Sequence, residues 1–114
     1  ALLVDDERLA RVELRRMLQA HPEVEVVGEA SGLSEAVTLL QREAVDVVFL
    51  DLQLHQEQGL TLAPLLSPQV RVVCVTAHDR YAVDAFGVRA LDYLLKPVSA
   101  ARLADTIARL GTPP

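Results

Sequence analysis

Short apolar runs alternate along this chain with stretches in which apolar residues recur at helical spacing. Runs of this kind predict β-strands, and they occupy residues 2–4, 24–30, 45–50, 70–76 and 91–95. The runs at 45–50 and 70–76 are almost continuously apolar, as expected of central parallel strands that are covered on both faces. The alternation therefore predicts an α/β fold, a doubly wound parallel sheet with helices on both sides.

Helices are predicted between the strands. Apolar residues follow helical spacing at 10–18, 33–40 and 100–107, and weaker patterns lie at 59–66 and 79–87. Ser99 is placed to cap the last of these helices, and Gly87 is placed to end the helix at 79–87. The length of 114 residues suits one domain, which we assign to residues 1–110. We expect the closing GTPP at 111–114 to break the last helix and to begin a linker.

Composition excludes several classes of function. No apolar run approaches the roughly 18 residues of a membrane-spanning helix. A single cysteine, Cys74, allows no internal disulfide and suits a reducing cytoplasm. The net charge of −5 argues against binding of nucleic acid or an anionic membrane by this segment itself. A partner protein or a cation is the expected counterpart.

Polar residues follow the apolar runs where a doubly wound sheet places its ligand site, outside the carboxyl ends of its strands. They are Asp5, Asp6, Asp51, Thr76 and Lys96. Carboxylates at adjacent strand tips lie roughly 5 Å apart, and two unit charges about 4 Å apart repel by roughly 4 kcal/mol at an effective dielectric of about 20. A cation is therefore expected among them, and hard oxygen ligands without clustered His or Cys favour Mg²⁺.

Each of these residues also has a simpler interpretation. Asp5 or Asp6 can cap the first helix, Lys96 can be a solvated lysine, and Thr76 can be a β-branched strand end. As a set, a carboxylate, a hard cation, a lysine and a hydroxyl suit the formation of an aspartyl phosphate. The charge on that group needs such partners.

The segments LLVDDERLA, VFLDLQL, VTAHDRYAVDAF and ALDYLLKP resemble the receiver domain of bacterial two-component response regulators, and the similarity covers essentially the whole chain. The stretch TAHDRYAVDAFGVRALDYLLKP is most similar to receivers of the LytTR-type response regulators, whose output domain binds DNA. The resemblance implies a flavodoxin-like sheet with strand order 2-1-3-4-5. It also implies a signalling module that assists its own phosphoryl transfer and hydrolysis, and not an enzyme that turns over a substrate.

The resemblance assigns roles to the residues beyond the strands. Asp51 matches the aspartate that accepts a phosphoryl group from the phosphohistidine of a sensor histidine kinase, and Lys96 matches the lysine that pairs with that group. The implied ligands of Mg²⁺ are Asp5, Asp6, Asp51 and the backbone carbonyl of Gln53.

Further positions match the part of a receiver that changes conformation. Thr76 matches the switch hydroxyl, and Tyr93 matches the aromatic residue that turns inward when this hydroxyl moves toward the phosphate. The Lys96–Pro97 bond matches a peptide bond that is usually cis, and Gly59 matches the glycine in the turn after the phosphorylated strand.

The resemblance also implies partners. We expect a homodimer through the face formed by the helix at 79–87, the strand at 91–95 and the last helix. DNA would be contacted only through an output domain that this chain does not include, and the protein is expected in the cytoplasm. Arg11, Arg15 and Arg16 are expected to form a solvated face of the first helix, with docking of the kinase as a second role.

Other functions remain as alternatives. His55 stands where the family usually has proline, so the loop after Asp51 loses a fixed φ, and a module that signals without phosphorylation stays open. A phosphatase of the haloacid dehalogenase type would need a second aspartate two residues after the nucleophile, where this chain has Gln53. A flavin binder would need a phosphate-cradling loop after the first strand, and DDER at 5–8 is acidic instead.

Overall fold

The sheet has the predicted architecture. The computed structural model describes residues 1–54, 57–77 and 90–111. Within them a five-stranded parallel sheet has the order β2-β1-β3-β6-β7. Its strands are β1 (Leu2–Val4), β2 (Gly28–Ala30), β3 (Val47–Leu50), β6 (Arg71–Thr76) and β7 (Asp92–Leu95). Counted along the chain, the strands of this sheet lie in the order 2-1-3-4-5, so the prediction of a flavodoxin-like doubly wound sheet is confirmed.

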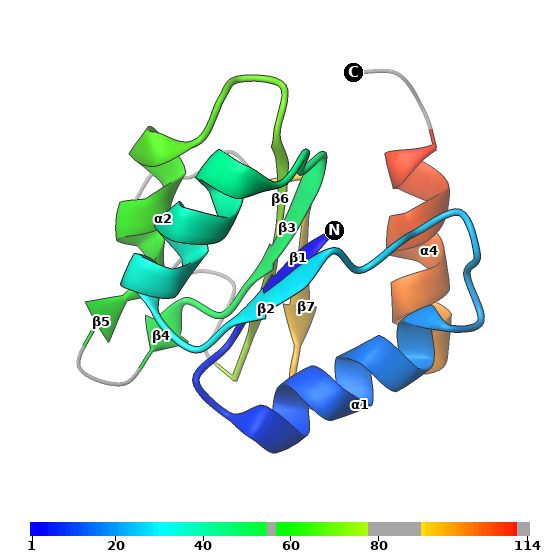
Figure 1. Cartoon of the computed structure of the whole chain (residues 1–114). Helices are drawn as coiled ribbons and strands as arrows, with labels where there is room; N and C mark the ends of the chain where they lie inside the picture. Colours follow the sequence, from blue (N-terminus) through cyan, green and yellow to red (C-terminus); the bar gives the residue numbers. More distant parts are fainter. Residues whose placement is uncertain (55–56, 78–89, 112–114) are drawn as a thin grey trace.

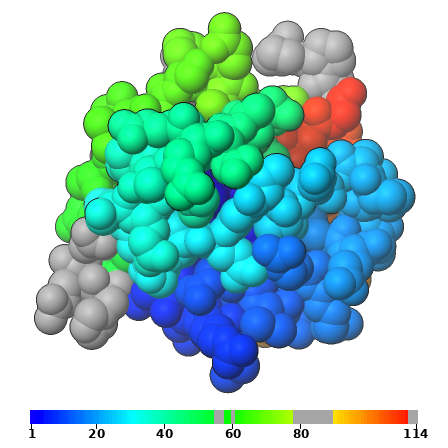
Figure 2. Space-filling model, viewed as in Figure 1, coloured from blue at the N-terminus to red at the C-terminus, as the bar shows by residue number. Residues whose placement is uncertain are grey.

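Helices cover both faces of the sheet (Figure 1). The helices α1 (Arg8–Leu18) and α4 (Ala100–Leu110) lie on one face, while α2 (Leu33–Arg42) and the 3-10 helix η1 (Gly59–Leu65) lie on the other. In the view of Figure 2, α2 and the segment that carries β2 lie over the strands, so that little of β1 remains visible. The described helices lack the combination of length and apolar character that a membrane crossing requires.

The central strands are apolar throughout because successive residues feed two different cores. In β3, Val48 and Leu50 belong to the core under α2 and η1, whereas Val47 and Phe49 belong to the core under α1 and α4. All residues of β3 are buried. A strand that alternated apolar and polar residues would leave one of these helix layers without a partner surface.

Two elements differ from the prediction. The strand expected at 24–30 pairs with the sheet only over Gly28–Ala30, because it lies at the edge and its neighbour β1 extends only from Leu2 to Val4. The helix expected at 59–66 is a 3-10 helix over Gly59–Leu65, and Pro64 inside it has no N–H to donate to an α-helical ladder.

The structure also contains an antiparallel pair that was not predicted, formed by β4 (Gln53–Leu54) and β5 (Glu57–Gln58). Strands of two residues are too short to produce an alternating pattern in the sequence. The predicted helix at 79–87, with its stop at Gly87, and His55 lie outside the described residues.

The last helix begins as predicted and is tied to the sheet by a buried carboxylate. The Ser99 hydroxyl accepts a hydrogen bond from the backbone N–H of Arg102 at 3.1 Å, which confirms the N-cap. Asp92 in β7 is 3% exposed and accepts hydrogen bonds from Arg102 at 3.0 Å and from the Thr106 hydroxyl at 2.7 Å. Burial raises the pKa of Asp92, but these hydrogen bonds outweigh it and lower the pKa to about 2.

Candidate functional site

The first and third strands of the chain end in carboxylates that the backbone holds at the edge of the sheet. The N–H of Asp5 donates to the Ala30 carbonyl at 3.0 Å, and the N–H of Asp51 donates to the Val4 carbonyl at 2.8 Å. These bonds extend the strand pairing by one residue beyond β1 and β3. Asp5 and Asp51 are only 7% and 5% exposed, so their carboxylates lie in a partly desolvated position between adjacent strands.

An acidic cluster forms around these aspartates. Among the described residues, the carboxylates of Asp5, Asp6, Glu7 and Asp51 each offer a ligand oxygen, and these atoms lie within 4.8 Å of one another. Such a set of hard oxygen donors fits a divalent cation such as Mg²⁺, which binds through carboxylates and retains several waters. The sequence does not single out Glu7 as a ligand, because an acidic residue at a helix start has an ordinary structural role. In the structure its side chain is exposed.

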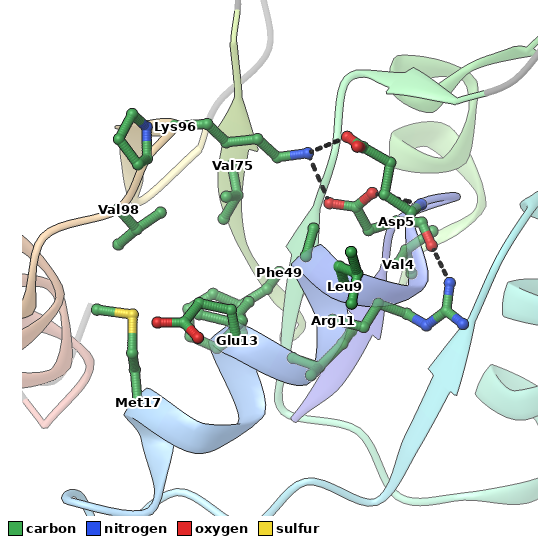
Figure 3. A pocket seen from close by; sticks show the side chains of 15 residues that line it. Val4, Asp5, Leu9, Arg11, Glu13, Met17, Phe49, Val75, Lys96 and Val98 are labelled. Carbon is green, nitrogen blue, oxygen red and sulfur yellow. Dashed lines mark hydrogen bonds and ion pairs between the residues drawn. The ribbon is translucent and has the colours of Figure 1, made fainter.

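Lys96 places its ammonium group in the acidic cluster. Its Nζ lies 2.8 Å from Oδ2 of Asp5, 3.0 Å from Oδ2 of Asp51 and 3.4 Å from Oε1 of Glu7. Figure 3 shows the side chain of Lys96 extending across the pocket toward Asp5. Burial lowers the pKa of the Lys96 ammonium, but its hydrogen bonds to Asp5 and Asp51 and their charges outweigh burial and raise it. The lysine is therefore fully protonated at neutral pH and offsets part of the repulsion between carboxylates.

Both carboxylate oxygens of Asp51 have a partner. Its Oδ1 accepts the backbone N–H of Gln53 at 3.0 Å, while its Oδ2 faces Lys96. Burial raises the pKa of the Asp51 carboxyl, and the hydrogen bonds from Gln53 and Lys96 oppose this increase without cancelling it. Gln53 thus contacts Asp51 through its N–H, and the role of its carbonyl as a metal ligand remains a prediction.

The other predicted site residues lie at the same edge of the sheet. Thr76 ends β6 and is 1% exposed, and its carbonyl accepts the backbone N–H of Lys96 at 2.9 Å. The Lys96–Pro97 bond is cis. Tyr93 in β7 is partly buried and packs against the core cluster under α2.

Gly59 supports the position of Asp51 through a close backbone approach. A Cβ at residue 59 would lie 2.1 Å from the carbonyl oxygen of Asp51, and the Gly59 N–H donates to the Leu52 carbonyl at 2.8 Å. Glycine is therefore required here because the chain passes directly against the backbone that presents the buried aspartate.

The simpler interpretation of the first aspartates as helix caps receives little support. The N-cap of α1 is Glu7, and within the described part of the chain no side chain caps this end. Asp5 Oδ1 instead accepts the N–H of Glu7 itself at 2.9 Å. This bond orders the turn before the helix and leaves Oδ2 of Asp5 facing Lys96.

The prediction of a solvated arginine face on the first helix is correct for two of its residues and wrong for the third. The side chains of Arg15 and Arg16 are 44% and 66% exposed, but that of Arg11 is only 15% exposed. Arg11 pairs with Glu29 on β2 and donates to the backbone carbonyl of Asp5. Sequence patterns did not indicate these contacts, because they join residues that are distant in the chain.

A groove of about 450 Å³ opens beside the acidic cluster (Figure 3). Its lining includes Leu9, Leu14 and Met17 of α1 and, after β7, Pro97 and Val98. Leu9 is 79% exposed. The polar end of the groove is formed by residues of the acidic cluster and by Lys96.

Comparisons with known proteins agree with the fold. The family model described as "Response regulator receiver domain" matches residues 1–108. An uncharacterized response regulatory protein of Vibrio cholerae is 48% identical over 112 residues, which are 96% of this chain and 47% of that protein. The transcriptional regulatory protein BtsR of Escherichia coli is 46% identical over 111 residues, which are 96% of this chain and 46% of BtsR.

A solved structure gives the same result. The REC domain of AraT, a response regulator from Geobacillus stearothermophilus, matches with a TM-score of 0.83 and 35% identity, over 96% of this chain and 89% of that domain. The chain spans about half the length of the curated relatives named above.

Proposed function

The chain belongs to the response regulator receiver domain family, and from this premise we propose that a sensor histidine kinase phosphorylates it on Asp51. The observation that supports this proposal best is the surroundings of that carboxylate. Asp51 is buried at a strand end, within the acidic cluster, and its Oδ2 lies 3.0 Å from Lys96 Nζ. A carboxylate with a cation on one side and ligands for a second cation beside it is suited to carry an anionic group.

The proposed step is the transfer of a phosphoryl group between two proteins. A carboxylate oxygen of Asp51 attacks the phosphorus of a phosphohistidine, the new O–P bond forms as the P–N bond breaks, and the imidazole leaves with the electron pair. Lys96 then pairs with oxygens of the new phosphoryl group, and the Thr76 hydroxyl donates to another. Both residues thereby stabilise charge that the aspartyl phosphate adds to the site.

A divalent cation completes the proposed site. We assign its binding to Asp5, Asp6, Asp51 and the backbone carbonyl of Gln53, with Glu7 at the rim of the same cluster. When bound, Mg²⁺ neutralises these carboxylates and lowers their repulsion for the incoming phosphoryl oxygens. The protein's own contribution is to hold the carboxylates in place before the donor arrives.

The signal would leave the site through Thr76 and Tyr93. Thr76 is followed by the segment that precedes β7, and its carbonyl is bonded to the N–H of Lys96. Movement of Thr76 toward the phosphoryl group would allow Tyr93 to turn inward and change the surface that includes β7 and α4. We propose that this surface pairs two receivers, together with the segment at 79–87.

We also propose a regulatory output beyond residue 110. BtsR is described as a transcriptional regulatory protein and is about twice as long as the aligned region. We propose that residues 111–114 begin a linker to an output domain, that this domain is of the DNA-binding LytTR type, and that the protein acts in the cytoplasm. DNA contact would then depend on that domain.

The groove beside the acidic cluster is our proposed kinase-docking surface. It combines exposed apolar residues of α1, such as Leu9, with a polar end at Lys96, through which phosphohistidine would reach Asp51. Arg16 lies on the exposed face of the same helix, whereas Arg11 is held by internal contacts. Of the arginines on α1, we therefore assign docking to the exposed residues and not to Arg11.

Intact mass spectrometry tests the proposal. The protein is incubated with a small phosphodonor such as acetyl phosphate, with Mg²⁺ or with EDTA, and is compared with Asp51→Asn. We expect the wild type to gain the mass of one phosphoryl group only with Mg²⁺, and the variant to gain none. Absence of any gain in the wild type would favour a module that signals without phosphorylation, and repeated release of phosphate would favour a phosphatase.

A further inference from the structure

We propose that Arg11 and Glu29 form a positioning pair that holds the β1–α1 turn, residues 5–7, in the geometry required for binding a divalent cation. The inference rests on the proposed function, because it concerns the same acidic cluster. It adds two residues that contribute no atom to that cluster and act on it through the backbone of Asp5.

Arg11 connects three segments of the fold. From α1, its Nε donates to Oε1 of Glu29 on β2 at 3.0 Å, and its Nη1 donates to the backbone carbonyl of Asp5 at 2.6 Å. Figure 3 shows the guanidinium group reaching Asp5 from the side opposite to Lys96. The arginine side chain is 15% exposed and the glutamate side chain is 29% exposed, so water competes only partly for these bonds.

These contacts hold the main chain of Asp5 on both sides. Its N–H donates to the Ala30 carbonyl of β2, and its carbonyl accepts from Arg11, which is itself fixed to Glu29 of β2. The side chain of Asp5 is held in turn by the N–H of Glu7. The direction of Oδ2 of Asp5, the carboxylate oxygen that faces Lys96, therefore depends on a backbone whose position Arg11 and Glu29 determine.

The affinity for Mg²⁺ is expected to depend on the position of the Asp5 backbone. The ion demands near-ideal octahedral geometry with short ligand distances, and partners that orient metal ligands from outside commonly change metal affinity when they are removed. A turn that shifts relative to β3 would move Asp5 and Asp6 away from Asp51, and the ion would bind more weakly.

Arg15 provides a matched control in the same helix. Its Nε also pairs with Glu29, at 2.8 Å from Oε2, but its side chain is 44% exposed. Within the described part of the chain, Arg15 makes no hydrogen bond to residues 5–7. Arg11 and Arg15 thus share a residue type, a helix and an ion-pair partner, and differ in the contact with Asp5.

The test compares Arg11→Lys with Arg15→Lys by isothermal titration of Mg²⁺ into the metal-free protein. Lysine keeps the positive charge but lacks the planar fork that serves two acceptors at once. We expect Arg11→Lys to weaken Mg²⁺ binding by about tenfold, the low end of the losses seen when partners of metal ligands are removed. We expect Arg15→Lys to stay within about twofold of wild type, since exposed ion pairs contribute little.

Two further measurements separate positioning from general destabilisation. Thermal unfolding in EDTA reports the stability of each variant, and titration is carried out well below the unfolding temperature. The rate of phosphorylation by acetyl phosphate is then measured at increasing Mg²⁺ concentration. For Arg11→Lys we expect a higher half-saturating concentration of Mg²⁺ and a maximal phosphorylation rate close to that of wild type. A merely structural role would lower stability and leave the half-saturating concentration unchanged.

Glu29→Gln keeps the proposal testable if Arg11→Lys folds poorly. It removes the charge that anchors Arg11 while preserving shape, and we expect weaker Mg²⁺ binding with the same split between half-saturation and maximal rate. Equal affinities of Arg11→Lys, Arg15→Lys and wild type would overturn this inference and leave the proposed function intact. If the wild type itself binds no Mg²⁺, the proposed function fails and this inference fails with it.

Discussion

Asp51 carries its charge at an energetic cost that the metal-free protein only partly offsets. Burial raises the pKa of its carboxyl, and neighbouring Asp5 adds to the increase, while Gln53 and Lys96 oppose it. Because the folded-state pKa lies above the unfolded value, ionised Asp51 lowers the stability of the folded state at neutral pH. Binding of a cation or a proton at Asp51 would therefore relieve this cost and stabilise the folded state.

Asp51→Asn should consequently stabilise the metal-free protein at pH 7 and raise its melting temperature by a few degrees. The advantage over wild type should shrink as the pH falls through the raised pKa of Asp51, since the wild-type carboxyl then becomes neutral as well. Thermal unfolding in EDTA from pH 7 to pH 4 measures both effects. A variant that is less stable than wild type in EDTA at pH 7 would contradict the account.

The same pair of proteins should respond differently to Mg²⁺. A ligand that binds only the folded state raises the free energy of unfolding by RT ln(1 + [L]/Kd). Because Asp51→Asn removes one proposed ligand and should bind Mg²⁺ more weakly, Mg²⁺ should raise the melting temperature of wild type more than that of the variant.

At the scale of elements, the segment after β3 must pass directly over the backbone of Asp51. Gly59 begins η1 at the point where a Cβ would meet the Asp51 carbonyl oxygen at 2.1 Å. The resemblance to receiver domains implies a glycine at this position, in the turn after the phosphorylated strand. The physical reason for glycine, a close approach, became visible only in the structure.

We expect Gly59→Ala to lower the free energy of unfolding by roughly 3 kcal/mol, the upper part of the range for overpacked sites, and to slow phosphorylation by displacing Asp51. Gly111→Ala is the control, because among the described residues its Cβ would meet the Ala108 carbonyl oxygen alone, at an ordinary 3.5 Å. Urea unfolding and phosphorylation by acetyl phosphate check both variants. Equal stabilities would contradict the proposed role of the close approach.

The attachment of α4 to β7 depends on Asp92, for which the sequence predicts only a place in a strand. Its carboxylate is 3% exposed and is paired with Arg102 and Arg109 of α4 at 3.0 and 3.2 Å. Arg102 also donates to the Tyr93 carbonyl at 3.1 Å. The helix and the strand that would carry the switch are therefore joined by one buried charge.

Asp92→Asn should lower the free energy of unfolding at pH 7 by roughly 2 kcal/mol, the value that corresponds to a pKa lowered from 3.8 to about 2. A lowered pKa stabilises the fold above the unfolded value, and this contribution is lost as pH falls from about 4 toward about 2. The difference between the variant and wild type in urea unfolding should narrow over that range. A difference that stays constant down to pH 3 would contradict the assignment.

Asp105→Asn, an exposed carboxylate on the same helix, provides the control for Asp92→Asn. Surface substitutions of this kind usually change stability by less than about 0.5 kcal/mol.

At the scale of the whole molecule, hydrophobic periodicity predicted the helices and strands that bury an apolar face. It did not predict the elements whose bounds depend on pairing with distant segments. The apolar runs of β3 and β6 and the helical faces of α1, α2 and α4 follow directly from burial on one or both sides. The β4–β5 pair and the shortened β2 depend on pairing partners distant in the chain, which periodicity does not encode.

The candidate site likewise has a part that the sequence predicts and a part that it does not. Strand ends predicted that Asp5, Asp51 and Lys96 share one edge of the sheet, because parallel strands align their carboxyl ends. The contribution of Arg11 depends on one guanidinium reaching both β2 and the turn after β1, and no sequence spacing indicates such a contact. Strand order itself came from the resemblance and not from any pattern in the residues.

At this edge of the sheet, Asp51 is the proposed acceptor of a phosphoryl group. Borohydride reduction after incubation with Mg²⁺ and acetyl phosphate, followed by peptide mass spectrometry, locates an acyl phosphate by converting the modified aspartate to homoserine. We expect homoserine at position 51 in the sample with Mg²⁺ and none in the sample with EDTA. Homoserine at another position, or none in a folded protein saturated with Mg²⁺, would contradict it.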